Sequence, residues 1–292
     1  MKGILMAGGS GSRLWPLTLA VSKQLLPLYN KPMVFYPLST LMLAEIRDIL
    51  LISSPQDLPQ YERLLGDGSG FGIRLRYLAQ PSPDGLAQAF TLGEAFLGNE
   101  PCVMILGDNL FYGNGLSRLL REARIAAEKG RATIFGCPVK DPRRFGVVET
   151  DAQGRVLSLE EKPVRPKSSF CVTGLYCYPK GVSALAHTLR PSSRGELEIT
   201  ALNDLYRERG LLDARLLGRG YAWFDAGTVD SLSDAAGFVR TVEARQGRHI
   251  SAPEEIAFRS GWLDRSGLLH AAKRYGEAPY GLYLQAVAEG VI

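Results

Sequence analysis

Short apolar runs alternate with segments of helical periodicity through the first half of the chain. Apolar or alternating runs predict buried strands over residues 3–7, 49–53, 73–79, 102–106 and 132–139. Apolar positions three and four residues apart predict helices over residues 37–46, 58–65, 86–96 and 116–128. This order predicts an α/β fold with a doubly wound, mostly parallel sheet flanked by helices. Sheets of this kind bind ligands beyond the carboxyl ends of their strands.

The pattern changes after about residue 140. Strand signals with short turns over residues 145–149, 156–159 and 170–178 indicate a small antiparallel part. Helices over 182–189, 198–208 and 229–245 follow, with strands at 214–217 and 221–224. From residue 252 the chain predicts only short helices, over 253–258, 263–273 and 279–288. We therefore expect one α/β domain over residues 1–245 and a helical appendage over residues 246–292 that packs on it.

Composition narrows the class of protein. Of 292 residues, 46% are apolar and 22% are charged, which excludes a disordered or fibrous chain. The net charge is only +4 and its signs are interspersed, so no nucleic-acid partner is expected. There is no signal peptide and no apolar run of membrane-spanning length, so no membrane partner is expected. Four cysteines without CxxC spacing predict a reduced, cytoplasmic protein.

Glycine is over-represented, and its richest loop follows the first strand. The loop Gly8-Gly9-Ser10-Gly11-Ser12-Arg13 lets backbone N–H groups approach phosphate oxygens without a Cβ clash. It lacks the Gly-Lys-Ser/Thr of a Walker A loop and the third glycine of the dinucleotide fingerprint. Arg13 in the loop and Lys23 soon after it favour a triphosphate. A flexible surface turn is the alternative.

Two aspartates follow strand signals and are candidate metal ligands. Asp108 lies in Gly107-Asp108-Asn109 and Asp225 in Trp223-Phe224-Asp225. Mg²⁺ is typically held by one or two carboxylates plus substrate phosphates, and the three scattered histidines offer no zinc spacing. The alternative for either aspartate is a helix N-cap or turn residue. From spacing alone, we interpret Glu161-Lys162 as charged side chains exposed to solvent and the loop at Gln80 as an ordinary turn.

Several segments together resemble the sugar nucleotidyltransferases, in particular those that form dTDP-glucose. They are LMAGGSGSRLWPLT, SKQLLPLYNKPMVFYPLSTLM, QPSPDGLAQAF, ILGDNLFYG, FGVVE, LEEKPVRPKS, VTGLYCY, RGELEIT, GYAWFDAGT and PEEIAFRSGWLD. The resemblance covers nearly the whole chain. It replaces the interpretations of Glu161-Lys162 and Gln80 from spacing alone with roles in a binding site. It implies a Rossmann-like sheet, with a nucleotide part mainly over residues 1–140 and a sugar part mainly over residues 141–228.

The resemblance also implies a role for each matching residue. The phosphates of dTTP would be bound by Gly8, Gly11, Ser12, Arg13 and Lys23, and Asp108 would also belong to the nucleotide site. The thymidine would contact Gln24, Gln80 and Gly85, and Mg²⁺ would be held by Asp108 and Asp225. The sugar would contact Asn109, Gly146, Glu161 and Val172, and its phosphate Lys162. The catalytic set is then Arg13, Lys23, Lys162, Asp108 and Asp225. Ser12 stands where the family has Thr, and Phe145 where Tyr is common.

The implied reaction transfers dTMP from dTTP to α-D-glucose 1-phosphate, giving dTDP-glucose and pyrophosphate, the first step of dTDP-L-rhamnose synthesis. No general base is required, because a phosphate monoester with a second pKa near 6 is already ionised at about pH 7. The alternatives are a related enzyme that uses UTP, CTP or ATP, and a noncatalytic nucleotide-sugar sensor.

The resemblance further implies a homotetramer with feedback inhibition by dTDP-L-rhamnose at a second nucleotide site. The matching residues are Gly115, Glu255, Ile256 and Arg259. The alternative is that Ile256 and its neighbours simply pack as helix.

Overall fold

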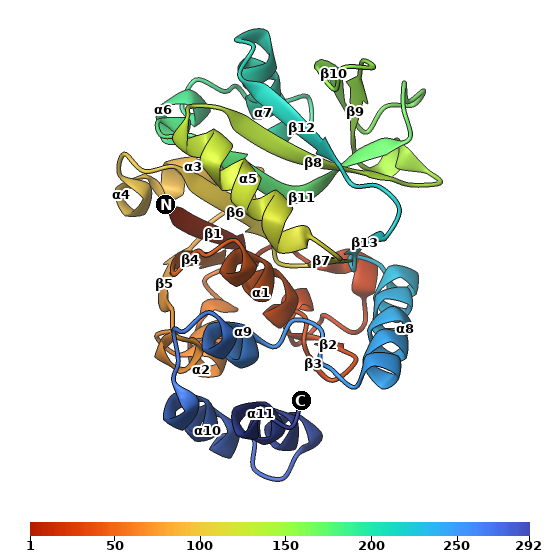
Figure 1. Cartoon of the computed structure of the whole chain (residues 1–292). Helices are drawn as coiled ribbons and strands as arrows, with labels where there is room; N and C mark the ends of the chain where they lie inside the picture. The colour runs from red at the N-terminus through yellow and green to blue at the C-terminus, as the bar shows by residue number, and fades with distance from the viewer.

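A nine-stranded mixed sheet forms the centre of the molecule, with helices on both faces (Figure 1). The computed structural model describes residues 1–292. Its parallel part has the spatial order β6-β1-β4-β5. The bounds are β1 Lys2–Met6, β4 Asp48–Ser53, β5 Arg74–Ala79 and β6 Cys102–Leu106. The helices that connect these strands are α1 Phe35–Leu43, α2 Leu58–Leu65, α3 Gln88–Leu92 and α4 Glu94–Leu97.

The two faces of the sheet carry separate apolar cores, as a parallel sheet buried on both sides requires. One core joins the sheet to α1, α2 and α5 (Leu116–Glu128), with Leu41, Tyr61 and Leu120 fully buried. The other joins it to α3, α4, α6 (Val182–Ala186) and α7 (Ile199–Glu208), around residues such as Phe90 and Leu202. Alternate residues of β1 point into opposite cores, Leu5 into the first and Ile4 into the second.

The order of the parallel strands creates a crevice beside β1. The chain runs from β1 to β4 and β5 on one side, and then returns to place β6 on the other side of β1. Doubly wound sheets bind ligands at such a reversal point, because the two following loops diverge there. The glycine loop follows β1 and Asp108 follows β6. The expected doubly wound, mostly parallel core is therefore confirmed.

The antiparallel part is built around the long strand β11 (Phe170–Tyr178). This strand pairs antiparallel with β6, β8 (Ala132–Pro138) and β9 (Gly146–Thr150). Strand β10 (Val156–Glu161) pairs with β9, and β12 (Leu212–Leu216) runs parallel to β8. A separate ribbon joins β7 (Asn109–Gly113) to β13 (Tyr221–Asp225), and a second small ribbon joins β2 (Pro27–Leu28) to β3 (Lys31–Pro32).

Two local expectations need correction. The helix expected over 86–96 is divided into α3 and α4 at Gly93, a residue with low helix propensity. Residues 109–113, for which the sequence predicted no element, form β7 because β13 pairs with them from more than 100 residues away along the chain. No helix is both long enough and apolar enough to cross a membrane.

The chain ends in helices, the last two of which lie at one end of the molecule (Figure 1). The long helix α8 (Val229–Gln246) begins with a capping box between Thr228 and Ser231. Helix α9 (Pro253–Arg259) packs against α1 and contributes Ala257 to the first core. Helices α10 (Arg265–Lys273) and α11 (Pro279–Glu289) form an apolar cluster of their own. The division of the chain at residue 246 stays a prediction.

The glycine-rich segment 66–72 has a packing role. A Cβ on Gly72 would lie 2.9 Å from the Cβ of Trp262, so only glycine lets the two approach this closely. Arg47 lies over the Trp262 ring, 5.3 Å from its centroid, and donates a hydrogen bond to the Gly72 carbonyl. Arg274 reaches back to the Leu64 carbonyl. The turn after α9 therefore packs on this segment.

Candidate active site

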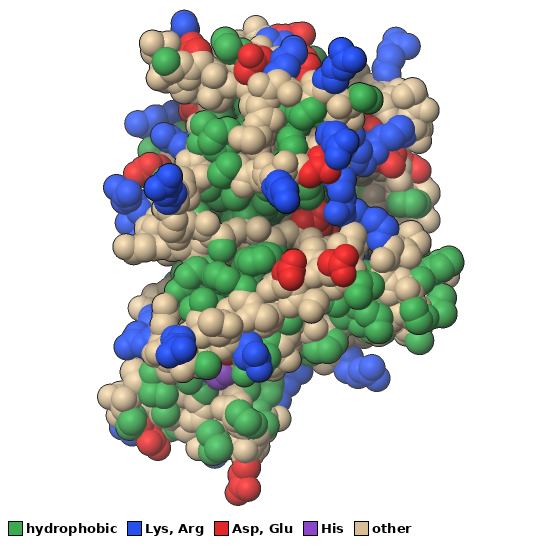
Figure 2. Space-filling model, turned by 90° about the vertical axis from the view of Figure 1, so that its right-hand side faces the viewer, with side chains coloured by type: hydrophobic (Ala, Val, Ile, Leu, Met, Phe, Trp, Pro, Cys, Tyr) green, Lys and Arg blue, Asp and Glu red, His purple; other side chains and the backbone are tan.

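Two adjoining cavities lie at the carboxyl ends of β1 and β6. The smaller, of about 240 Å³, is lined by residues that include Gly8, Gly9, Gln24, Gln80 and Gly85. The larger, of about 490 Å³, is lined by residues that include Arg13, Asn109, Gly146, Glu161, Lys162, Val172 and Asp225. Lys23 and Asp108 line both cavities. On the face shown in Figure 2, Lys and Arg side chains gather along a hollow that has acidic side chains at its edge.

The glycine loop has a backbone shape that only glycine adopts without strain. Gly9 and Gly11 have φ of 103° and 60°, in the left-handed region. A short helical turn, Ser12–Leu14, follows at once and turns the chain back. Thr18 supports the loop by donating to the Gly11 carbonyl at 2.8 Å. Gly8 and Gly9 line the smaller cavity and Arg13 the larger one, whereas Gly11 and Ser12 line neither. Phosphate oxygens could thus approach the first part of the loop.

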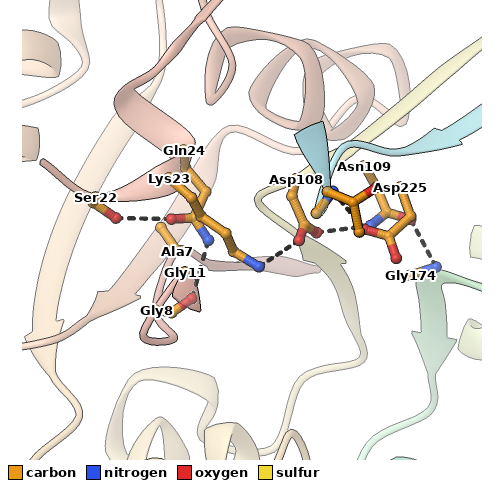
Figure 3. Close-up of polar contacts among 12 residues, drawn as sticks. Ala7, Gly8, Gly11, Ser22, Lys23, Gln24, Asp108, Asn109, Gly174 and Asp225 are labelled. Carbon is orange, nitrogen blue, oxygen red and sulfur yellow. Dashed lines mark hydrogen bonds and ion pairs between the residues drawn. The ribbon is translucent and has the colours of Figure 1, made fainter. Parts of the chain in front are cut away.

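Gln24 supports this loop through its side chain, which reaches Gly8 (Figure 3). Its side-chain amide donates to the Gly8 carbonyl at 3.0 Å. Its Oε1 accepts from the Ser22 and Tyr61 hydroxyls at 2.8 and 3.2 Å. The residue therefore lines the smaller cavity and also fixes the position of the loop. The sequence had suggested only the thymidine contact.

Gln80 and Gly85 close the far side of the smaller cavity. The Gln80 amide donates to Gln88, whose amide in turn donates to Asp84. Gly85 has φ of 110°, and a Cβ there would lie 2.4 Å from the carbonyl oxygen of Leu197. The segment before α7 therefore presses against this turn, which explains the need for glycine.

Asp108 and Asp225 come together because the β7–β13 ribbon pairs Asp225 with Asn109. The Ala226 amide also donates to the Asp108 carbonyl at 3.0 Å. One Asp108 oxygen accepts from Lys23 at 2.5 Å and the other from the Asn109 amide at 2.9 Å. Figure 3 shows Lys23 reaching Asp108 from one side, with Asn109 and Asp225 on the other.

The two carboxylates have opposite electrostatic settings. Burial favours protonation of Asp108, but the Lys23 ammonium and the hydrogen bonds outweigh it and hold the pKa of Asp108 below its usual value. Burial and the neighbouring Asp108 charge raise the pKa of Asp225 to about 6. Such a pair of oxygen ligands attracts a hard cation. No third His, Cys, Asp or Glu joins them, which fits Mg²⁺ completed by substrate phosphates.

Arg13 lies beside this acidic pair. A Cβ on Gly227 would be 2.8 Å from the Arg13 guanidinium and 2.9 Å from Asp225 Oδ1. The absence of a side chain at Gly227 therefore lets Arg13 reach the cavity next to Asp225. The charge of Arg13 also acts to lower the pKa of Asp225, against the larger effect of burial.

The residues expected to contact the sugar lie around the ends of β9, β10 and β11. Glu161 pairs in register with Gly146, where a Cβ would approach the Glu161 carboxylate to 3.3 Å. Thr200 donates to Glu161 Oε2 at 2.6 Å. Lys162 has φ of 45° and places its ammonium 3.8 Å from Glu161. A carboxylate and an ammonium thus face the same cavity, able to bind a hydroxyl and a phosphate.

Asn109 is held rigidly at the floor of the larger cavity. Its Oδ1 accepts from the Gly174 amide at 3.0 Å and from the Trp223 indole at 2.6 Å, while its amide donates to Asp108. A Cβ on Gly174 would be 2.8 Å from the Asn109 side chain. Asn109 therefore links the acidic pair to the wall formed by β11.

The family follows from a comparison with known proteins. A model of the nucleotidyl transferase family matches residues 2–242, most of the chain. The chain belongs to the nucleotidyl transferase family. A Neisseria gonorrhoeae relative named glucose-1-phosphate thymidylyltransferase is 56% identical over 284 residues, 97% of this chain and 98% of that protein. A Mycobacterium tuberculosis protein of the same name is 51% identical over 289 residues, 99% of each chain.

A solved structure agrees with these relatives. A Bacillus anthracis protein, described as a glucose-1-phosphate thymidylyltransferase and crystallised with sucrose, has 40% identity and a TM-score of 0.76. The match covers 82% of this chain and 95% of that one. The resemblance to sugar nucleotidyltransferases and the expected fold class are both confirmed.

This nucleotidyl transferase has further cavity-lining residues that the sequence did not single out. They include Arg144, Tyr176, Ile199, Thr200 and Trp223 in the larger cavity, Glu196 in the smaller one, and Leu86 in both. Arg194 also reaches Glu161, at 3.4 Å. Thr200 and Trp223 lie within the motifs RGELEIT and GYAWFDAGT, so a closer reading of those segments offered a signal. Nothing in DPRRFG distinguished Arg144 from its neighbours.

The residues expected to form a second, regulatory site lie away from these cavities. Glu255, Ile256 and Arg259 are on α9, and Gly115 precedes α5 with φ of 81°. Arg259 donates to Glu255 at 2.6 Å, and Tyr283 of α11 donates to the other Glu255 oxygen at 2.5 Å. Ile256 packs on the first core.

Proposed function

We propose that the chain is a glucose-1-phosphate thymidylyltransferase. It would transfer dTMP from dTTP to α-D-glucose 1-phosphate and release dTDP-glucose and pyrophosphate. The observation that carries this proposal is the continuity of the two cavities at Lys23 and Asp108. A nucleotide in the smaller cavity and a sugar phosphate in the larger one would meet at these two side chains. The names of the relatives support the choice of substrates.

The chemistry needs positioning and charge compensation more than proton transfer. A phosphate oxygen of the sugar 1-phosphate attacks the α-phosphorus of dTTP, and the bond to the bridging oxygen of the leaving pyrophosphate breaks. Both reactants are anions that repel each other, so fixed cations aligned with the reacting groups lower the barrier. Arg13 and Lys23 would serve the triphosphate and Lys162 the sugar phosphate. The glycine loop would add backbone N–H groups.

A divalent cation fits the acidic pair described above. We infer that Asp108 and Asp225 hold Mg²⁺, whose charge would neutralise phosphate oxygens during transfer. Lys23, bonded to Asp108 at 2.5 Å, places a second positive charge at the same point. Because burial and Asp108 raise the pKa of Asp225 to about 6, half of its carboxyl groups are protonated near pH 6 in the metal-free protein, so we expect metal binding to weaken as the pH falls through this value.

The choice of nucleotide separates this proposal from its nearest alternative. An enzyme of the same family that uses UTP would present the same acidic pair and glycine loop. Incubation with glucose 1-phosphate, Mg²⁺ and each of dTTP, UTP, CTP and ATP, with measurement of pyrophosphate release, tests the assignment. We expect the highest kcat/KM with dTTP. A clear preference for another nucleotide overturns the thymidylyl assignment, and no release with any of the four favours a noncatalytic sensor.

We further propose a cytoplasmic homotetramer that is inhibited by dTDP-L-rhamnose at a site containing Gly115, Glu255, Ile256 and Arg259. The support is the motif resemblance, and the Arg259–Glu255 ion pair offers both charges to a ligand. Sedimentation equilibrium tests the tetramer. Inhibition by dTDP-L-rhamnose that is unchanged in Arg259→Ala excludes Arg259 from the site. All four cysteines are free and buried, as in a protein of a reducing compartment.

A further inference from the structure

The larger cavity contains one cation that neither the sequence motifs nor the proposed reaction uses. It is lined by Arg13, Lys23, Arg144 and Lys162. Lys23 is paired with Asp108, and Lys162 lies 3.8 Å from Glu161. Arg144 is exposed, has no carboxylate within 4.0 Å of its guanidinium, and makes no side-chain hydrogen bond. A free guanidinium at a phosphate-sized cavity is a ready bidentate partner for a phosphate.

The local structure separates Arg144 from its neighbour Arg143. Both belong to the short helical turn Pro142–Arg144, which Asp141 caps by accepting from the Arg143 amide. The Arg143 guanidinium returns to Asp141 with two hydrogen bonds, each of 2.8 Å. Arg143 is therefore engaged and lines neither cavity, while Arg144 lines the larger one.

A series of aromatic contacts connects Arg144 to the acidic pair. Its guanidinium lies 5.9 Å from the centroid of the Phe145 ring. Phe145 packs edge-on against Trp223 at 5.2 Å, and the Trp223 indole donates to Asn109 at 2.6 Å. The base of the Arg144 side chain is thus set relative to Asn109, the residue next to Asp108. The charge of Arg144 also contributes to lowering the pKa of Asp225, after the larger effects of burial, Asp108, Lys23 and Arg13.

We propose that Arg144 binds the phosphate of the sugar 1-phosphate, opposite Lys162, and compensates its charge as it approaches the nucleotide. We choose this phosphate over the triphosphate because of the residues that share a cavity with Arg144. Arg144 shares its cavity with Glu161, Lys162 and Val172, and it does not line the smaller cavity with Gly8 and Gln80. The inference rests on the proposed function and adds a substrate-binding residue to it.

The test compares Arg144→Ala and Arg144→Lys with the matched control Arg143→Ala. Initial rates of pyrophosphate release are measured with glucose 1-phosphate and dTTP varied in turn. We expect Arg144→Ala to raise the KM for glucose 1-phosphate about 10- to 100-fold, the size of a lost charged hydrogen-bond pair. The KM for dTTP should change less than about threefold. Arg144→Lys should recover part of the loss, because it keeps the charge without the planar fork.

The control and the wild-type protein separate the ways in which this reasoning could fail. Arg143→Ala should stay within about twofold of wild type, because an exposed ion pair contributes little. Equal KM values in Arg144→Ala and Arg143→Ala overturn the assignment of Arg144. A rise in the dTTP KM that matches or exceeds the sugar-phosphate rise also overturns it. If wild-type protein forms no dTDP-glucose from these substrates, the proposed function fails instead. Because Arg144 makes no hydrogen bond and the Arg143–Asp141 pair is exposed, the melting temperatures of all variants should stay close to that of wild type.

Discussion

Replacing Asp225 with asparagine should stabilise the metal-free protein while it removes activity. Burial and the facing Asp108 carboxylate raise the pKa of Asp225 to about 6, from an ordinary value of 3.8. At neutral pH the folded protein therefore contains an ionised Asp225 carboxylate in surroundings that disfavour its charge. Asparagine removes that charge, and its Oδ1 can still accept the Gly227 amide, which donates to Asp225 at 3.1 Å. The predicted gain comes from removing a charge that burial desolvates and that Asp108 repels.

The magnitude follows from the pKa. The difference between 3.8 and about 6 corresponds to roughly 3 kcal/mol of unfolding free energy at about 1.36 kcal/mol per pH unit. Since the folded pKa is the higher one, the folded protein binds more protons than the unfolded chain between these values. Wild-type stability is therefore lost as pH rises from about 4 to about 6 through this group. Below about pH 4 the carboxyl is protonated in both states, and wild type and Asp225→Asn should be equally stable.

The assay is unfolding in urea with EDTA present, at pH values from about 4 to 8. We expect the gap between Asp225→Asn and wild type to open as pH rises and to become constant above about pH 6.5. Asp234→Asn, on the exposed side of α8, is the matched control and should show no such gap. Added Mg²⁺ with dTTP should stabilise wild type more than Asp225→Asn. A variant that is no more stable than wild type at pH 7.5, or a gap that does not depend on pH, would refute the reasoning.

Three further substitutions test other parts of the site and fold. Asp108→Asn should lower kcat about 100-fold or more, because one anionic ligand of the metal pair is lost, and near-normal turnover contradicts its role. Lys162→Ala should raise the KM for glucose 1-phosphate more than that for dTTP, with Lys167→Ala as the exposed control; an equal rise in both argues against it. Trp262→Ala should lower the melting temperature by roughly 2–6 °C through lost packing on the segment 66–72. Trp15→Ala, at a residue that is 59% exposed, should leave the melting temperature unchanged. Equal melting temperatures for the two variants would contradict the packing of Trp262 on the segment 66–72.

Local pattern was sufficient to predict the elements whose residues face a core. The strand at 102–106, the helix at 116–128 and the strand at 170–178 agree with β6, α5 and β11 at both ends. Each has a strong apolar period and a turn at its boundary. The strand β7 was missed because its partner β13 lies more than 100 residues away, and a distant partner leaves no local signal. The contact between Gly72 and Trp262 was missed for the same reason, since the two residues are far apart in the sequence.

The site was predictable to the extent that its residues follow strands or match motifs. The glycine loop and Asp108 could be placed together because the carboxyl ends of parallel strands share one edge. The pairing of Asp225 with Asn109 depends on the β7–β13 ribbon, so spacing alone left Asp225 open to a capping role. Arg144 carried no signal, because adjacent Arg143 has the same chemistry and only the folded turn gives the two different directions.

Net charge over a whole chain says little about a protein that binds two phosphorylated substrates. The sequence carries only +4 over 292 residues. The larger cavity nevertheless collects Arg13, Lys23, Arg144 and Lys162 against Asp108, Asp225 and Glu161. Lys23 and Asp108 lie largely buried in it, where solvent screens charges less than on the surface, while Arg13 and Arg144 stay exposed to a ligand. The acidic side chains of this group can hold a cation, and the basic side chains can bind the phosphates. Affinity for such substrates is therefore set by which charges the β7–β13 ribbon and the glycine loop bring together, and not by how many the chain contains.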